Sequence, residues 1–208
     1  MAGIQGIELT QFHPVGQNYP AGVYRLTNVD EGRTFEITVR NTPANMVTID
    51  VRNPAGTPYP GVATGQLVQD NQQNLIRASL QHLQTDNIDG RVPGLGALVV
   101  YIFAANVLLT AATIQVSTMA PTAAGFYDAV GFPVLATANA YFQQRLQNAG
   151  NDQDLINELN QRRNTFLQAF ANPNAVQGTL PYAGAPEALP QQIIAANAAR
   201  MARWRLVP

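Results

Sequence analysis

The most constraining feature of this sequence is a long stretch that is almost free of charge. From Val92 to Gln144 the only charged residue is Asp128. Within it, residues 97–116 are nearly continuously apolar, and roughly 20 apolar residues are enough to cross a bilayer. No basic residue follows closely, and Asn106 and later polar residues interrupt the stretch at helical intervals. We therefore expect a helix buried inside the protein, with its few polar groups hydrogen-bonded internally. A membrane-inserting segment over 97–116 is the alternative.

The segment before this stretch alternates between apolar and polar residues. Phe35, Ile37 and Val39 lie on one face of a predicted strand, and threonines and charged residues lie on the other. Alternation of this kind predicts an antiparallel sheet with one covered face. The predicted strands are Tyr24–Thr27, Thr34–Arg40 and Met46–Arg52, with turn residues between them.

The rest of the chain has helical periodicity. Apolar residues recur at intervals of three and four, as in a helix with one buried face. The predicted helices cover residues 66–84, 134–149, 152–171 and 188–206. The fold class is therefore α+β: an N-terminal antiparallel β-sheet followed by a mainly α-helical region with a buried apolar central helix. We expect a single domain over 1–208, with 1–62 mainly β and 63–208 mainly α.

Composition excludes several classes of protein. The chain has no cysteine and therefore no disulfide, thiolate metal site or cysteine nucleophile. A net charge of −1 argues against a general nucleic-acid coat, which needs a large basic excess. The start of the chain lacks the basic and apolar regions of a secretory signal. We expect a protein that is cytoplasmic at synthesis, or released without a signal peptide, with possible action in the cytosol of a target cell.

All 12 basic residues are arginine, and lysine is absent. A GC-rich genome is one explanation. The other is selection for survival in a foreign cytosol, because lysine is the attachment site of ubiquitin. Toxins with intracellular targets show this bias.

The sequence contains none of the common motifs for binding a metal ion or a phosphate group. His13 and His82 lie far apart, and neither has a carboxylate at ligand spacing, so no metal site is expected. Residues 90–96 contain three glycines but no lysine, and they lack the strand–loop–helix context of a phosphate loop. We therefore expect no cofactor and no nucleotide. The G-x-S-x-G motif of serine hydrolases is also absent.

One segment resembles a known family. Residues 114–126, from Ile114-Gln115-Val116 to Ala123-Ala124-Gly125-Phe126, resemble the central helix of ribosome-inactivating proteins, where an Ile-Gln-Met stretch leads into Glu-Ala-Ala-Arg-Phe. The order of β region, apolar helix and late tryptophan is similar as well. Small lysine-poor fungal rRNA N-glycosylases are similar in size and composition. Thr122 and Gly125 stand where the family has its catalytic glutamate and arginine, so a shared activity requires an acid from elsewhere.

Depurination of RNA requires a flipped base stacked on aromatic rings, an acid, and an arginine near phosphate. Asp128 is one candidate catalytic acid, because apolar surroundings would raise the pKa of its carboxyl group. The second candidate is Glu158 with Arg162. The candidate substrate-binding residues are Tyr101, Tyr127, Tyr141, Arg145 and Trp204. The structural alternatives are a turn aspartate, an ordinary ion pair on a helix, and a tryptophan anchored in the core.

The leading functional hypothesis is a cytotoxic or defence RNA N-glycosylase that depurinates ribosomal RNA and inhibits translation. Its partner would be the ribosome or ribosomal RNA, without metal or nucleotide cofactor, and a homo-oligomer is possible. A virion or other structural assembly subunit is the first alternative, because low charge and abundant amides suit large buried interfaces. A membrane-inserting toxin is the second.

Overall fold

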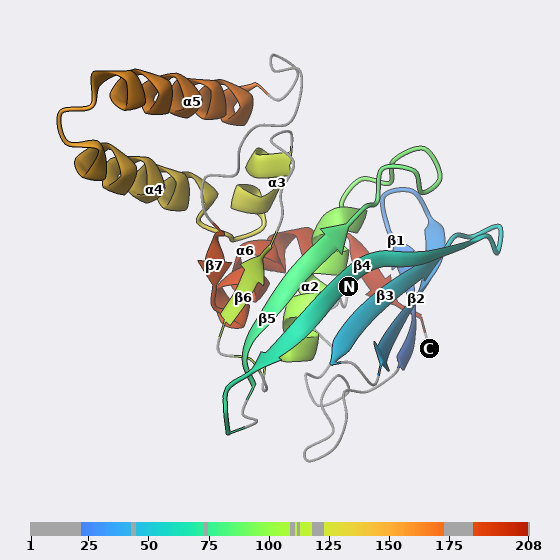
Figure 1. Ribbon diagram of the computed structural model, residues 1–208. Coiled ribbons are helices and arrows are strands. Elements are labelled where there is room, and N and C mark those ends of the chain that lie inside the picture. The colour runs from blue at the N-terminus through green and yellow to red at the C-terminus, as the bar shows by residue number, and fades with distance from the viewer. Residues whose placement is uncertain are drawn as a thin grey trace.

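The computed structural model describes residues 22–42, 45–72, 75–108, 111, 113–117, 123–172 and 185–207. An antiparallel meander forms the first half of the protein (Figure 1). Its strands are β1 (Gly22–Asn28), β2 (Arg33–Thr42), β3 (Met46–Arg52), β4 (Pro58–Gln69) and β5 (Leu75–Leu83). The first three strands confirm the alternation, since Phe35, Ile37 and Val39 are fully buried. The predicted α+β class is confirmed as well.

The predicted helix over 66–84 is wrong, because this segment is the end of β4 and the whole of β5. Leu67 of β4 lies opposite Ala78 of β5, and Leu80 of β5 lies opposite Gly65 of β4. The leucines therefore point into the core from two paired strands. Their helical spacing in the sequence is a coincidence, and the β region extends to residue 83.

A parallel crossover follows β5. The chain passes through α2 (Leu95–Val107) and returns as β6 (Thr113–Val116), which pairs parallel to β5 from Arg77↔Thr113 to Leu80↔Val116. Parallel neighbours need such a crossover, and here a helix supplies it. Every residue of α2 except Gly96 and Tyr101 is buried. The buried central helix is thus confirmed, although it ends at Val107 and the predicted segment continues as a strand.

The membrane-inserting alternative finds no matching helix in the described part of the chain. Among those residues, no helix combines the length and the apolar character that crossing a bilayer requires.

Asn106 contradicts the expectation that the polar groups of this helix are hydrogen-bonded. Its side chain is fully buried, and neither Oδ1 nor Nδ2 has a hydrogen-bond partner among the described residues. Such a group carries the desolvation penalty of burial without a compensating bond.

A helical hairpin projects from one end of the sheet (Figure 1). It follows the short α3 (Ala124–Ala129) and consists of α4 (Val134–Ala149) and α5 (Gln153–Ala171). Phe142 of α4 and Phe166 of α5 pack in the seam between them, with ring centroids 6.4 Å apart. Asp152 caps α5 by accepting a hydrogen bond of 3.1 Å from the Leu155 N–H. Both predicted helices are confirmed here.

The C-terminal segment returns to the sheet. After β7 (Glu187–Ala188), α6 (Pro190–Met201) packs against α2, and β8 (Trp204–Leu206) pairs antiparallel with β1. The predicted helix over 188–206 is therefore too long, since its last residues form the edge strand. The sheet order is β7-β6-β5-β4-β3-β2-β1-β8.

Candidate functional site

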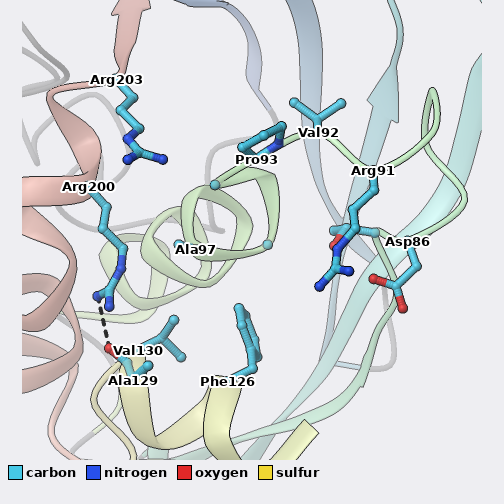
Figure 2. Close-up of a pocket in the computed structure, with 13 residues that line it drawn as sticks. Asp86, Arg91, Val92, Pro93, Ala97, Phe126, Ala129, Val130, Arg200 and Arg203 are labelled. Carbon is cyan, nitrogen blue, oxygen red and sulfur yellow. Dashed lines mark hydrogen bonds between the residues drawn. The ribbon is translucent and has the colours of Figure 1, made fainter. Parts of the chain in front are cut away.

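A pocket of about 500 Å³ lies at the amino end of α2 (Figure 2). We call it the amino-end pocket. Its walls come from the loop between β5 and α2, the first turn of α2, and parts of α3 and α6. The lining residues are Thr85, Asp86, Arg91, Val92, Pro93, Gly94, Gly96, Ala97, Phe126, Ala129, Val130, Arg200 and Arg203.

The backbone of this pocket depends on two glycines. Gly94 precedes the helix with φ of 80°, a left-handed conformation that glycine adopts without steric cost. A Cβ at Gly96 would stand 3.2 Å from the Phe126 ring and 3.3 Å from Thr85 Oγ1. Small residues at both positions keep the start of α2 open to the pocket.

The first turn of α2 offers backbone donors. The Leu95 N–H donates to the Val92 carbonyl and the Leu98 N–H to the Gly94 carbonyl. Gly96 and Ala97 lie between them, and their N–H groups have no acceptor among the described residues. Free N–H groups and the helix dipole together make such an end attractive to anions.

Three arginines against one aspartate give the pocket a positive charge. Arg91 extends into the pocket from the loop, and its guanidinium has no partner among the described residues (Figure 2). Arg200 of α6 donates from Nη1 to the carbonyls of Ala129 and Ala196, each at 2.9 Å, which fixes its position on the wall. Arg203 has a long ion pair of 3.5 Å with Asp30.

The pocket also lies at the carboxyl end of a parallel strand. Thr85 and Asp86 follow β5 after one intervening residue, Gln84, and the pairing of β5 with β6 ends at Leu80 and Val116. Because β5 continues to Leu83, its last residues pass beyond the described end of β6. Open sheets bind ligands at this end of their parallel strands.

The predicted constellation around Asp128 is not part of this pocket. Asp128 is exposed, and its Oδ1 accepts a hydrogen bond of 3.4 Å from the Leu135 N–H. The expectation of apolar surroundings for this carboxylate is therefore wrong. The α3 residues that face the core are Ala124 and Tyr127, and Asp128 faces outward. Tyr127 is buried against Phe126 and Phe132, and burial raises the pKa of its phenol to about 12.

The other predicted residues lie in pairs on the hairpin. Glu158 and Arg162 form an exposed ion pair one turn apart on α5. On α4, the Arg145 guanidinium lies 6.0 Å from the centre of the Tyr141 ring. Neither pair contributes to the lining of the amino-end pocket.

Two predicted aromatic residues belong to the core. Trp204 is fully buried on β8 and meets Phe35 edge to face at 6.0 Å. Its location agrees with the alternative of a core anchor. Tyr101 of α2 is partly buried against the core, and burial raises the pKa of its phenol.

The sequence reasoning missed Arg91, Arg200 and Arg203, and a local signal existed for the first of them. Residues 90–96 lack lysine, and the sequence also predicts no strand–loop–helix context for them. The second expectation is wrong, because β5 precedes the loop and α2 follows it. Arg200 and Arg203 come from a distant helix, so only the tertiary fold brings them to the pocket.

No group of three metal-ligating side chains occurs in the part of the chain that the structure describes, where His82 is exposed on β5; His13 lies outside it. Comparisons with known proteins add no assignment: no family model, curated protein or solved structure matches this chain.

Proposed function

We propose that the amino-end pocket binds a cofactor that carries a diphosphate, and that this cofactor is of the coenzyme A type. The protein would then be an acyltransferase. The observation that carries the proposal is that Arg91, Arg200 and Arg203 line the same pocket as the start of α2, where the N–H groups of Gly96 and Ala97 have no acceptor among the described residues. Arginine is well suited to this task, since its planar fork matches the geometry of phosphate oxygens.

The size and charge of the pocket favour a diphosphate over a single small anion. A volume of about 500 Å³ falls within the range of small-molecule and cofactor sites. The two N–H groups without a described acceptor belong to adjacent residues, and the arginines line the same pocket from the loop, from α6 and from the turn after it. One phosphate would engage the backbone donors, and a second would be in reach of a guanidinium.

The strand beside the pocket favours coenzyme A among such cofactors. An extended group with amides binds well along a strand edge, where backbone N–H and C=O groups are presented at regular intervals. Coenzyme A carries two amides in the arm between its diphosphate and its thiol. The strand β5 ends at Leu83 and leads through Gln84 to Thr85 and Asp86 of the pocket, so an extended arm bound at the pocket would run alongside the end of this strand.

The chemistry of such a cofactor is acyl transfer. Arg91, Arg200 and Arg203 would hold the diphosphate, and the bound thioester would supply an activated acyl group for transfer to a nucleophile such as an amine.

The proposal is tested by calorimetric titration of the full chain with coenzyme A, inorganic pyrophosphate, ADP and a short RNA. We expect coenzyme A to bind most tightly. The R91Q variant should lose about tenfold in affinity, because a charge-assisted hydrogen bond contributes roughly 1.5–3 kcal/mol and 1.4 kcal/mol is tenfold. R25Q is the matched control, since Arg25 is exposed on β1 and pairs with Glu36.

The outcomes separate the two functional hypotheses. Coenzyme A binding that weakens in R91Q and not in R25Q supports the acyltransferase. Binding of RNA alone would overturn it in favour of an RNA-directed activity. Depurination of ribosomal RNA stays a prediction, and the residues proposed for it do not line the amino-end pocket.

A further inference from the structure

The loop that carries Arg91 has an unusual backbone. Asp89, Gly90, Arg91 and Gly94 have φ of 48°, 73°, 74° and 80°, all in the left-handed region. Aspartate enters this region occasionally, whereas arginine, with its long side chain, rarely does. Such a conformation persists only where surrounding contacts impose it, and it concentrates at functional sites.

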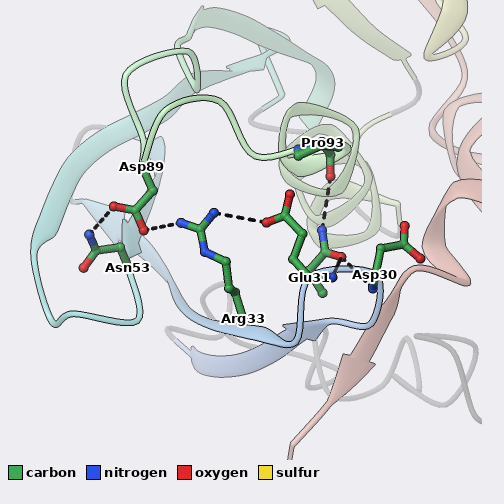
Figure 3. Close-up of polar contacts among 7 residues, drawn as sticks. Asp30, Glu31, Arg33, Asn53, Asp89 and Pro93 are labelled. Carbon is green, nitrogen blue, oxygen red and sulfur yellow. Dashed lines mark hydrogen bonds and ion pairs between the residues drawn. The ribbon is translucent and has the colours of Figure 1, made fainter.

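Contacts from outside the loop hold it at Asp89 (Figure 3). Asp89 Oδ1 accepts a hydrogen bond of 2.6 Å from Asn53 Nδ2, and Oδ2 pairs with Arg33 Nη2 at 2.5 Å. Both partners are themselves fixed: Arg33 also pairs with Glu31 at 3.1 Å, and Asn53 accepts from the Thr57 N–H at 2.7 Å. We call Asp89, Arg33 and Asn53 the Asp89 cluster.

A second contact holds the loop beyond Arg91. Asn28 is fully buried at the end of β1 and donates from Nδ2 to the Pro93 carbonyl at 3.3 Å. Ile88 and Val92 are buried as well, so the residues on both sides of Arg91 are anchored. Arg91 itself is exposed, and only its backbone is constrained.

We propose that the Asp89 cluster positions Arg91 for binding the cofactor diphosphate, by imposing the left-handed backbone that directs its side chain into the amino-end pocket. This inference rests on the proposed function of that pocket. The residues of the cluster do not touch the ligand; they act through Arg91. None of the three lines the pocket.

The test is a double-mutant cycle on binding of coenzyme A, followed by calorimetry. The D89G variant removes the carboxylate and leaves a residue that adopts positive φ freely, so the chain should still fold. We expect D89G to raise Kd by up to about tenfold, the limit set by R91Q, and D89N, which keeps one acceptor oxygen, to lie between D89G and the wild type. In the R91Q background D89G should have no further effect.

A general structural role would give a different result. If D89G weakens binding equally in the wild-type and R91Q backgrounds, or does not weaken it in either, the positioning role is overturned while the cofactor site stands. If the wild-type chain binds neither coenzyme A nor pyrophosphate, the proposed function fails, and this inference fails with it. Amide hydrogen exchange gives a second readout: D89G should accelerate exchange at Arg91 and leave α4 and α5 unchanged.

Discussion

Arg33 of β2 forms an ion pair of 2.5 Å with Asp89, although 56 residues separate the two in the chain. The pair joins the antiparallel meander to the loop that leads into α2. The pair holds the Arg91 loop against the sheet, because Asp89 lies only two residues before Arg91 in that loop. The meander therefore supports the pocket without contributing to its walls.

Replacing Gly94 by alanine should affect both stability and binding. A side chain at φ of 80° costs about 1–2 kcal/mol, which corresponds to a fall in Tm of about 2–8 °C for a chain of this size. A shifted loop should also weaken the binding of coenzyme A. G32A is the matched control, because Gly32 has φ of 65° with open space around it and is not part of the pocket lining. Equal losses of affinity in both variants would contradict the assignment of Gly94 to the site.

Tyr127 should make stability fall at high pH. Its pKa is raised from 10 to about 12 in the folded protein, so its contribution is fully present below pH 10 and is lost as pH rises through 12. A difference of about two units corresponds to about 2–3 kcal/mol. Urea unfolding between pH 9 and 12 should therefore show a steeper loss for the wild type than for Y127F. Parallel curves would show that the phenol is not buried as described.

The unpartnered Asn106 should be replaceable with a gain in stability. An N106L variant removes two buried polar atoms without breaking any bond to a described residue, and we expect it to raise the free energy of unfolding by about 1–3 kcal/mol. N197L is the control, because Asn197 donates to the carbonyls of Val130 and Ile193 at 3.0 and 2.7 Å. That variant should destabilise the chain. A destabilised N106L would indicate a partner for the Asn106 amide outside the described residues.

The depurination hypothesis has its own test. Ribosomes are incubated with the protein, and their RNA is treated with aniline, which cleaves at depurinated sites. The N-glycosylase hypothesis predicts a diagnostic fragment, whereas the acyltransferase predicts none, since neither Asp128 nor Glu158 lines the amino-end pocket. A fragment that disappears in D128N or E158Q would establish the N-glycosylase and its acid, and would overturn the acyltransferase as the main activity.

Local patterns predicted the elements that have one buried face. The alternation around Phe35 and Ile49 predicted β2 and β3, because those strands bury one face and expose the other. The seam between α4 and α5 likewise has the spacing of a half-buried helix. Local periodicity predicts a helix or a strand when one face of the element is buried and the opposite face is exposed.

The same reasoning failed in the middle of the sheet. In β5, Ala78, Ser79 and Leu80 are buried in succession, so the strand does not alternate, and its leucines matched a helical interval instead. Because a helix was predicted in place of β5, no strand was predicted before Gly90. The strand–loop–helix context of the pocket was therefore missed. Arg200 and Arg203 had no local signal, because they reach the site only through the packing of α6 on α2.

The location of the cofactor site is tested most directly by a two-dimensional ¹H–¹⁵N NMR titration of the full chain with coenzyme A. We predict that the largest shifts occur at the amides of Gly94, Gly96 and Ala97, with smaller shifts at Leu83, and that the Gly94–Ala97 shifts are reduced in R91Q. Shifts confined to α4 and α5, or to the outer face of β2 and β3, would contradict the proposed site.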